Sequence, residues 1–143
     1  MQDHKQLVVW QLAHDLTIRL HLITRKVSAR AAPGLVPQLL RASASVPANI
    51  AEGCGQDTSA QFARFLTIAI ASASEVENHV ALAVGLGLFA DAPAAELTAD
   101  VQRLRRMTYT LRKRVLARAS APSVPALPDT AHQVPGTPAT PSS

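Results

Sequence analysis

The sequence predicts an all-α protein, an antiparallel up-down four-helix bundle followed by a disordered proline-rich tail. Apolar residues recur at three- and four-residue steps through four segments, as they do on one face of an α-helix. Leu, Ala, Val and Ile dominate while aromatic residues make up only 3%, a composition that suits helix packing better than a sheet. Because the loops are short and no segment resembles a strand, we expect the helices to pack as antiparallel neighbours.

The first predicted helix, at about residues 5–29, carries apolar residues on two sides. One stripe has helical spacing and comprises Val9, Leu12, Ala13, Leu16, Leu20, Ile23 and Val27. On nearly the opposite side lie Leu7, Trp10, Ile18 and Leu22. This second side either packs against neighbouring helices of the same domain or forms an interface with another subunit. Periodicity alone leaves both interpretations open.

The second predicted helix, residues 35–53, follows the Pro-Gly break in "AAPGLVP". Pro47 lies inside it. Because proline offers no N–H to the Ser43 carbonyl and clashes with it, we expect a kink there. The helix should stop near Gly53, since glycine suits the left-handed conformation that is common at helix ends.

The third and fourth predicted helices span residues 58–87 and 94–119, which places the whole bundle within residues 1–119. The third begins with a capping box, Thr58 followed by Gln61, and its middle, "AIASASE", consists of small residues that permit close helix packing. The fourth has a narrow apolar stripe, which is typical of a bundle helix. Residues 120–143 hold six prolines and no apolar periodicity, so we expect them to be disordered.

The expected location is cytoplasmic. The lone Cys54 excludes an internal disulfide and indicates a reducing compartment. No signal peptide is evident, and the longest apolar run, residues 80–90, is too short to span a bilayer.

Motifs for chemistry are weak. In "PANIAEGCGQ" the two glycines precede a helix, but the Lys-Ser or Lys-Thr of a phosphate loop is missing, so we interpret the segment as a helix-ending corner. Cys54 has no histidine nearby in the sequence. Glu75 and His79 share a helix face that Glu52 could approach, but the Glu-x-x-His pairs of a di-iron bundle are absent. We therefore expect no catalytic residue, no metal and no cofactor.

Polar side chains in apolar helical surroundings indicate instead a structural network at the corner between the second and third helices. Burying a charge is costly unless the charge is paired and hydrogen-bonded. We expect the network to comprise Arg41, Asn49, Glu52, Arg64 and Glu75, with the arginines as counter-charges. If so, Glu52→Ala should destabilise the fold.

Positive charge is concentrated in the fourth helix. The segment from Asp100 to Arg118 contains one acid and seven basic residues, which give it a local net charge of +6. The basic residues are Arg103, Arg105, Arg106, Arg112, Lys113, Arg114 and Arg118. A solvated face is the simplest account, but such an excess repels itself and an anionic partner would relieve it. Nucleic acid suits this better than an acidic membrane, since the apolar stripe is needed for the core. With Tyr109 the only aromatic residue in the helix, we expect recognition of shape or backbone.

Three blocks, "LVVWQLAHDL", "GLVPQLLRASASVPANIAEG" and "QFARFLTIAIASASEVE", resemble in order and spacing the four-helix-bundle family encoded in intervening sequences of bacterial 23S ribosomal RNA genes. The resemblance covers about residues 7–88. It implies a non-catalytic bundle that assembles into a homopentamer, in agreement with the second apolar side of the first helix. Where that family usually has an aromatic residue and Gly-Arg, this chain has Cys54, Gly55 and Gln56.

A structurally similar protein is the accessory variability determinant of diversity-generating retroelements, a basic pentamer that binds nucleic acid and associates with a reverse transcriptase. This similarity implies a homo-oligomer that binds structured RNA or DNA as an accessory to a reverse transcriptase, and the charge of the fourth helix indicates that helix as the binding surface. The alternative is a protein-interaction scaffold without direct nucleic-acid binding, whose basic face meets an acidic protein patch.

Overall fold

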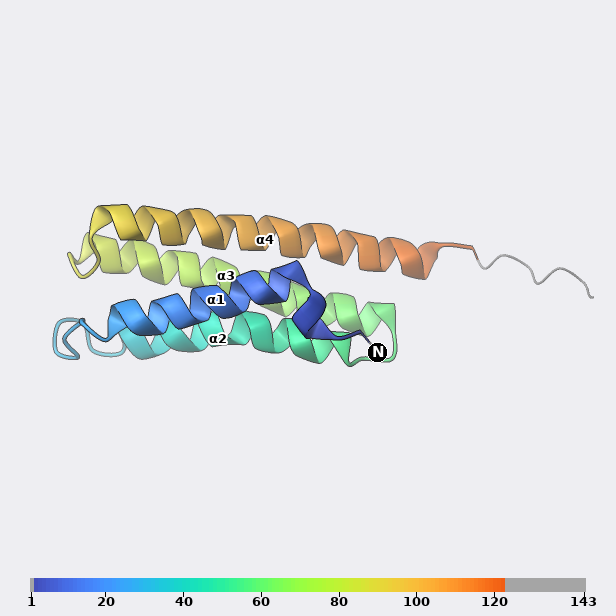
Figure 1. The fold of residues 1–143 in the computed structure, drawn as a ribbon, viewed down its shortest axis with the longest axis horizontal. Coiled ribbons are helices and arrows are strands. Elements are labelled where there is room, and N and C mark those ends of the chain that lie inside the picture. The colour runs from blue at the N-terminus through green and yellow to red at the C-terminus, as the bar shows by residue number, and fades with distance from the viewer. Residues whose placement is uncertain (1, 123–143) are drawn as a thin grey trace, which may run out of the picture.

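The computed structural model describes residues 2–122, in which it contains four α-helices, one short 3-10 helix and no strand. The 3-10 helix η1 spans His4–Gln6, and the α-helices are α1 (Val8–Thr24), α2 (Leu35–Cys54), α3 (Ser59–Gly85) and α4 (Asp91–Ser120). They run up and down alongside one another, so the predicted antiparallel bundle is confirmed (Figure 1). Most of the tail predicted to be disordered, from residue 123 onward, lies outside the described residues.

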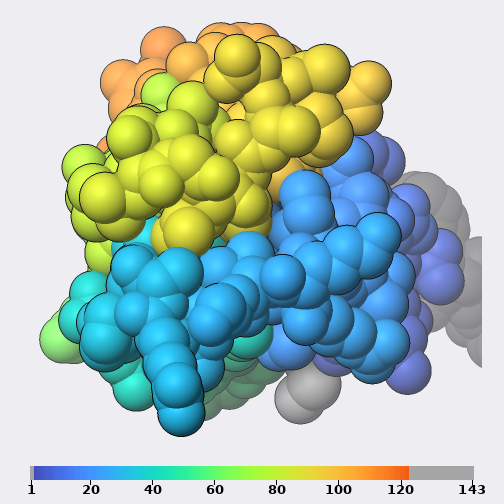
Figure 2. All heavy atoms as spheres, turned by 90° about the vertical axis from the view of Figure 1, so that its left-hand side faces the viewer, coloured from blue at the N-terminus to red at the C-terminus, as the bar shows by residue number. Residues whose placement is uncertain are grey.

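Each helix contacts its two neighbours around the bundle, and α1 does not contact α3. The α1–α2 connection and the α3–α4 turn close the same end of the bundle (Figures 1 and 2). The packing of α3 against α2 and α4 is the most extensive. It is close because α3 turns small residues inward: Ala63, Ala69, Ser72, Ala73 and Ala83. No helix within residues 2–122 is long and apolar enough to cross a membrane.

α1 is shorter than the segment predicted for it. Leu7 takes an extended conformation after η1, so the α-helix begins only at Val8. At the other end Thr24 Oγ1 donates to the Leu20 carbonyl at 2.7 Å, a side-chain bond of the kind that competes with helix continuation. The chain then turns through residues 25–34 before α2 begins.

The two apolar sides of α1 have different surroundings. Leu7 and Trp10 are half-buried against the core, and the Trp10 ring stacks on His14 with centroids 4.7 Å apart. Ile18 and Leu22 are 47% and 50% exposed. Part of the second side therefore belongs to the bundle, and part of it stays open to solvent.

α2 continues through Pro47 as a single helix. The Ser43 carbonyl, which has no N–H partner at residue 47, lies 2.9 Å from Thr17 Oγ1 of α1, whose single hydroxyl proton is shared with the Ala13 carbonyl at 2.8 Å. A buried carbonyl without a partner would cost free energy. A neighbouring helix thus supplies the hydrogen bond that the proline removes.

The α2–α3 corner contains both a confirmed prediction and a wrong one. Thr58 Oγ1 accepts from Gln61 N at 3.2 Å and Gln61 Oε1 accepts from Thr58 N at 3.3 Å, which is the predicted capping box. Gly53, however, is not a left-handed helix end, since α2 runs to Cys54. A Cβ at Gly53 would lie 2.7 Å from Phe62 Cδ2, so this glycine is required by the close approach of α3.

Candidate nucleic-acid interface

α4 buries one narrow apolar stripe, and its basic side chains spread over the rest of the helix surface. The buried side consists of Ala94, Leu97, Val101, Leu104, Thr108 and Val115. The exposed basic residues are Arg103, Arg106, Lys113, Arg114 and Arg118, and Arg112 is half-buried at the α3 edge. At 3.6 residues per turn, Arg103, Arg106 and Lys113 lie opposite the buried stripe, whereas Arg112, Arg114 and Arg118 lie on its flanks. We use the term basic surface of α4 for these six side chains: Arg103, Arg106, Arg112, Lys113, Arg114 and Arg118.

Two ion pairs determine how much of the charge between residues 100 and 118 of α4 is neutralised. The only acid between residues 100 and 118, Asp100, receives a hydrogen bond from Arg19 of α1, with Arg19 Nη2 2.6 Å from Asp100 Oδ2. Arg105 Nη1 lies 2.7 Å from Glu77 Oε2 of α3. Within residues 2–122 no carboxylate pairs with the six side chains of the basic surface. The excess of positive charge therefore persists in the folded chain.

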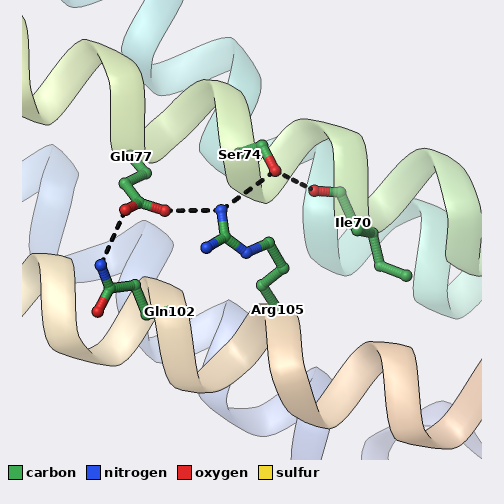
Figure 3. Close-up of polar contacts among 5 residues, drawn as sticks. All are labelled: Ile70, Ser74, Glu77, Gln102 and Arg105. Atoms are coloured by element: carbon green, nitrogen blue, oxygen red, sulfur yellow. Dashed lines mark hydrogen bonds and ion pairs between the residues drawn. The ribbon is translucent and has the colours of Figure 1, made fainter.

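Arg105 belongs to a polar cluster that joins α3 to α4 (Figure 3). Glu77 accepts from Arg105 through Oε2 and from Gln102 Nε2 at 2.9 Å through Oε1. Arg105 Nη1 also lies 3.4 Å from Ser74 Oγ, which donates to the Ile70 carbonyl. Since the Arg105 and Glu77 side chains are 37% and 25% exposed, water screens the pair, which is worth about 0.5–1 kcal/mol. Arg105 thus joins α4 to α3 through a carboxylate, which no other basic residue of α4 does within residues 2–122.

Two further contacts involve the side of α4 toward α3: Arg112 contacts α3, and Lys113 lies near Tyr109. Arg112 Nε donates to Thr67 Oγ1 at 2.8 Å, which holds the guanidinium over the α3–α4 seam. Lys113 Nζ lies 5.9 Å from the centroid of the Tyr109 ring, within cation–π range. The Tyr109 side chain is exposed.

Surface cavities border α4 on both sides. One of about 420 Å³ faces α3 and is lined by Ile70, Arg105, Arg106, Tyr109 and Thr110. Another of about 460 Å³ faces α1 and is lined by Leu7, Val8, Val9, Arg106, Met107, Thr110, Leu111 and Arg114. A third of about 540 Å³ near the start of α3 is lined by Ala60, Ala63, Arg64, Thr67, Ile68, Arg112 and Leu116. Each combines apolar lining with at least one guanidinium.

The polar network predicted for the α2–α3 corner is wrong for most of its members. Arg41, Glu52 and Arg64 are exposed, and within residues 2–122 none of them forms an ion pair. Glu75 is also exposed and lies 3.3 Å from His79 Nε2 of its own helix. These long side chains reach water, so their charges need no buried counter-charge.

The polar side-chain contact that does form between α2 and α3 is uncharged. Asn49 Nδ2 donates to the Ser45 carbonyl at 2.8 Å and to Ser45 Oγ at 2.9 Å. Ser45 Oγ in turn lies 2.9 Å from Ser72 Oγ of α3. Asn49 was predicted to take part, whereas Ser72 was missed, although it lies in the small-residue stretch "AIASASE". Sequence reasoning also missed that Arg64 shares a cavity with Arg112 and so extends the basic surface onto α3.

Groups with potential for other chemistry are few. Burial raises the pKa of the Cys54 thiol, and the negative charge of Asp3 raises it further, which keeps the thiol protonated at neutral pH. Among the described residues, no group of three or more His, Cys, Asp or Glu side chains is placed to hold a metal ion.

Comparisons with known proteins agree with this architecture. The model of the 23S rRNA-intervening sequence protein family matches residues 5–110, which cover η1, α1, α2, α3 and much of α4. No curated protein matches the chain. A solved structure, a protein with unknown function from the S23 ribosomal protein family of Bacteroides thetaiotaomicron, is similar with a TM-score of 0.68 and 22% identity over 74% of this chain and 96% of that chain. The chain belongs to the 23S rRNA-intervening sequence protein family.

Proposed function

We propose that the protein is a non-catalytic, cytoplasmic homo-oligomer that binds structured RNA or DNA through the basic surface of α4. The observation that carries the proposal is the set of six cations that have no carboxylate partner within residues 2–122. Like charges three and four residues apart on a helix repel each other. Phosphates would remove that repulsion, and release of their counterions would drive binding.

A mobility-shift titration over a salt series tests this proposal. The test variant carries Arg103→Gln, Arg106→Gln, Arg114→Gln and Arg118→Gln. The matched control carries Arg25→Gln, Lys26→Gln, Arg30→Gln and Arg41→Gln, which removes the same charge from exposed positions outside α4. We expect wild type to lose affinity steeply with salt, and the α4 variant to bind more weakly and with a shallower slope. If both variants lose the same amount of affinity, only the net charge of the protein matters, and the proposal that α4 is the binding surface is contradicted.

Assembly with itself is the second part of the proposal. Exposed leucine and isoleucine side chains lie on two helices that do not contact each other: Ile18 and Leu22 on α1, and on α3 Ile68 and Leu82, followed by Leu86 at the C-cap of α3. Leu82 and Leu86 are 48% and 52% exposed. Two distinct apolar patches on one subunit suit a head-to-tail contact that closes into a ring. We expect five subunits, the number that the family resemblance implies.

Sedimentation velocity on two variants tests the head-to-tail contact. Ile18→Glu with Leu22→Glu, and separately Leu82→Glu with Leu86→Glu, should each give monomers. Mixing the two should give a dimer, because one intact patch of each kind remains. A variant that keeps the wild-type assembly would show that its patch lies outside the interface.

The third part of the proposal is the partner. Following the similarity to the accessory variability determinant, we propose that the chain acts beside a reverse transcriptase in a diversity-generating retroelement. A reverse-transcriptase gene and a variable repeat next to this gene, and co-purification of the two proteins, would support that role. A position inside a ribosomal RNA gene would contradict it.

A protein-interaction scaffold is the alternative, and one observation favours it. The cavity between α1 and α4 has an apolar lining that includes Val8, Met107 and Leu111, with Arg106 and Arg114 also lining it. That combination suits an acidic amphipathic helix as well as a phosphate backbone. Absence of any nucleic-acid shift at low salt would favour this alternative.

A further inference from the structure

Tyr109 is the only tyrosine of the chain, and its side chain is 52% exposed on α4. It lies outside the buried stripe of the helix, so its ring contributes little to the core. An exposed aromatic ring among charged neighbours is a feature of surfaces that bind a partner.

The neighbours of Tyr109 on the helix surface are all basic. Residues three and four positions away are adjacent on an α-helix, and here they are Arg105, Arg106, Arg112 and Lys113. Lys113 Nζ lies 5.9 Å from the ring centroid, and Arg112, three positions after Tyr109 on the helix, donates to Thr67 of α3. Arg105 is the one member with a carboxylate partner, Glu77. Around one exposed ring, the adjacent helix positions therefore carry three cations that have no carboxylate partner within residues 2–122.

A cavity adjoins the ring. It has a volume of about 420 Å³, and its lining combines Ile70 of α3 with Arg105, Arg106, Tyr109 and Thr110 of α4. This volume lies within the roughly 300–1,000 Å³ usual for small-ligand sites. Ile70 and Tyr109 offer apolar surface to a flat ring, and Arg105 and Arg106 line the same cavity.

Resting on the function proposed above, we propose that Tyr109 stacks on an unpaired nucleobase, while Arg106, Arg112 and Lys113 hold the phosphates next to that nucleotide. In a continuous duplex both faces of each internal base are covered by its neighbours and cannot reach this ring. The preferred ligand is therefore RNA or DNA with a loop, bulge or single-stranded end. Such sites combine a cationic path with aromatic stacking and show little dependence on base identity.

Competition between two probes tests the proposal on the full-length, assembled protein. One probe is a hairpin with an unpaired loop, and the other is a blunt duplex with the same number of phosphates. We expect the hairpin to bind more tightly. Tyr109→Ala should weaken hairpin binding about tenfold or more and leave duplex binding unchanged. Tyr109→Phe, which keeps the ring, should bind both probes as wild type does.

The outcomes separate this inference from the proposed function. Equal binding of both probes, unaffected by Tyr109→Ala, would overturn the stacking site while leaving the basic surface intact as a duplex-binding face. Loss of hairpin binding in Tyr109→Phe as well as Tyr109→Ala would assign the effect to the hydroxyl and overturn stacking. If neither probe binds wild type at low salt, both proposals are overturned.

Fluorescence gives a direct readout of stacking. Trp10 is the only tryptophan in the chain and lies on α1 between His4 and His14, outside the proposed site. In a variant with Trp10→Phe and Tyr109→Trp, we expect the hairpin to quench tryptophan emission and the duplex to leave it unchanged. Wild type, with Trp10 alone, is the control and should respond to neither. Equal quenching of the variant by both probes would contradict selective stacking.

Discussion

The α2–α3 interface and the outer side of α4 both carry polar side chains, but they use them in opposite ways. Between α2 and α3 the polar groups are uncharged and bond to one another, with Asn49 and Ser45 meeting Ser72. On α4 the polar groups are cations, and six of them have no carboxylate partner within residues 2–122. In the first region, the polar atoms hydrogen-bond to one another and hold the two helices together. The second keeps its charge available, which is the property that a partner-binding surface requires.

The largest effect is expected where α2 and α3 are closest. Gly53→Ala should lower the free energy of unfolding by about 1–3 kcal/mol, because the new Cβ would lie 2.7 Å from Phe62 Cδ2. Urea unfolding measures the loss. The matched control is Gly85→Ala, where the added Cβ meets nothing within 4 Å and should leave stability equal or slightly higher. If both substitutions lower the free energy of unfolding equally, close packing of α3 against Gly53 is not the reason for the loss.

Removal of the hydrogen bond that compensates for Pro47 should have the next largest effect. Thr17→Val leaves the buried Ser43 carbonyl without its donor and should cost about 1–2 kcal/mol. In a Pro47→Ala background the same substitution should cost less, because the N–H of alanine can bond that carbonyl. A double-mutant cycle from urea unfolding gives the coupling directly. Additive effects would show that Thr17 stabilises the bundle in another way.

The ion pair between α3 and α4 connects the two regions compared above. Glu77→Gln should lower stability by about 0.5–1 kcal/mol at low salt and less at high salt, because the pair is half-exposed. It also releases Arg105, so nucleic-acid binding should tighten and its salt dependence should steepen by roughly one phosphate contact. Unfolding and mobility-shift titrations measure the two effects.

Glu75→Gln is the control for that substitution. It removes the same charge from α3 at an exposed residue that contacts His79 of its own helix and not α4. It should leave the salt dependence of binding unchanged. If Glu75→Gln and Glu77→Gln tighten binding equally, net charge rather than the release of Arg105 is responsible.

The sequence predicted the fold well because each helix carries a long, regular apolar pattern with recognisable ends. The four helices, their antiparallel packing and the Thr58–Gln61 capping box all follow from local spacing. The charge of α4 could also be counted in advance. Which of these charges are neutralised by ion pairs could not be predicted, because the pairs join residues far apart in the sequence. Arg19 and Asp100 are 81 positions apart, and Arg105 and Glu77 are 28 positions apart. Only the packed bundle determines which cations keep a partner.

The candidate site shows the same limit. The spacing of Arg105, Arg106, Arg112 and Lys113 around Tyr109 is present in the sequence, but the exposure of the ring and the cavity it shares with Ile70 depend on α3. The predicted charged network failed for a related reason. Periodicity places Arg41, Glu52 and Arg64 on helices, but it does not show that their long side chains reach solvent at the helix edges. Short side chains between close helices, such as Ser45 and Ser72, made the contact instead.

The smallest effect concerns Cys54, at the end of α2. Burial and then the negative charge of Asp3 raise the pKa of its thiol, so the folded chain holds the thiol proton more tightly than the unfolded chain does. The resulting stability is fully present below the unfolded thiol pKa of about 8.5 and is lost as pH rises through the higher folded pKa. Urea midpoints measured across alkaline pH should therefore fall more steeply for wild type than for Cys54→Ala. Parallel curves would show that the thiol ionises equally easily in both states, and the tight α2–α3 corner would then not be shielding it from water.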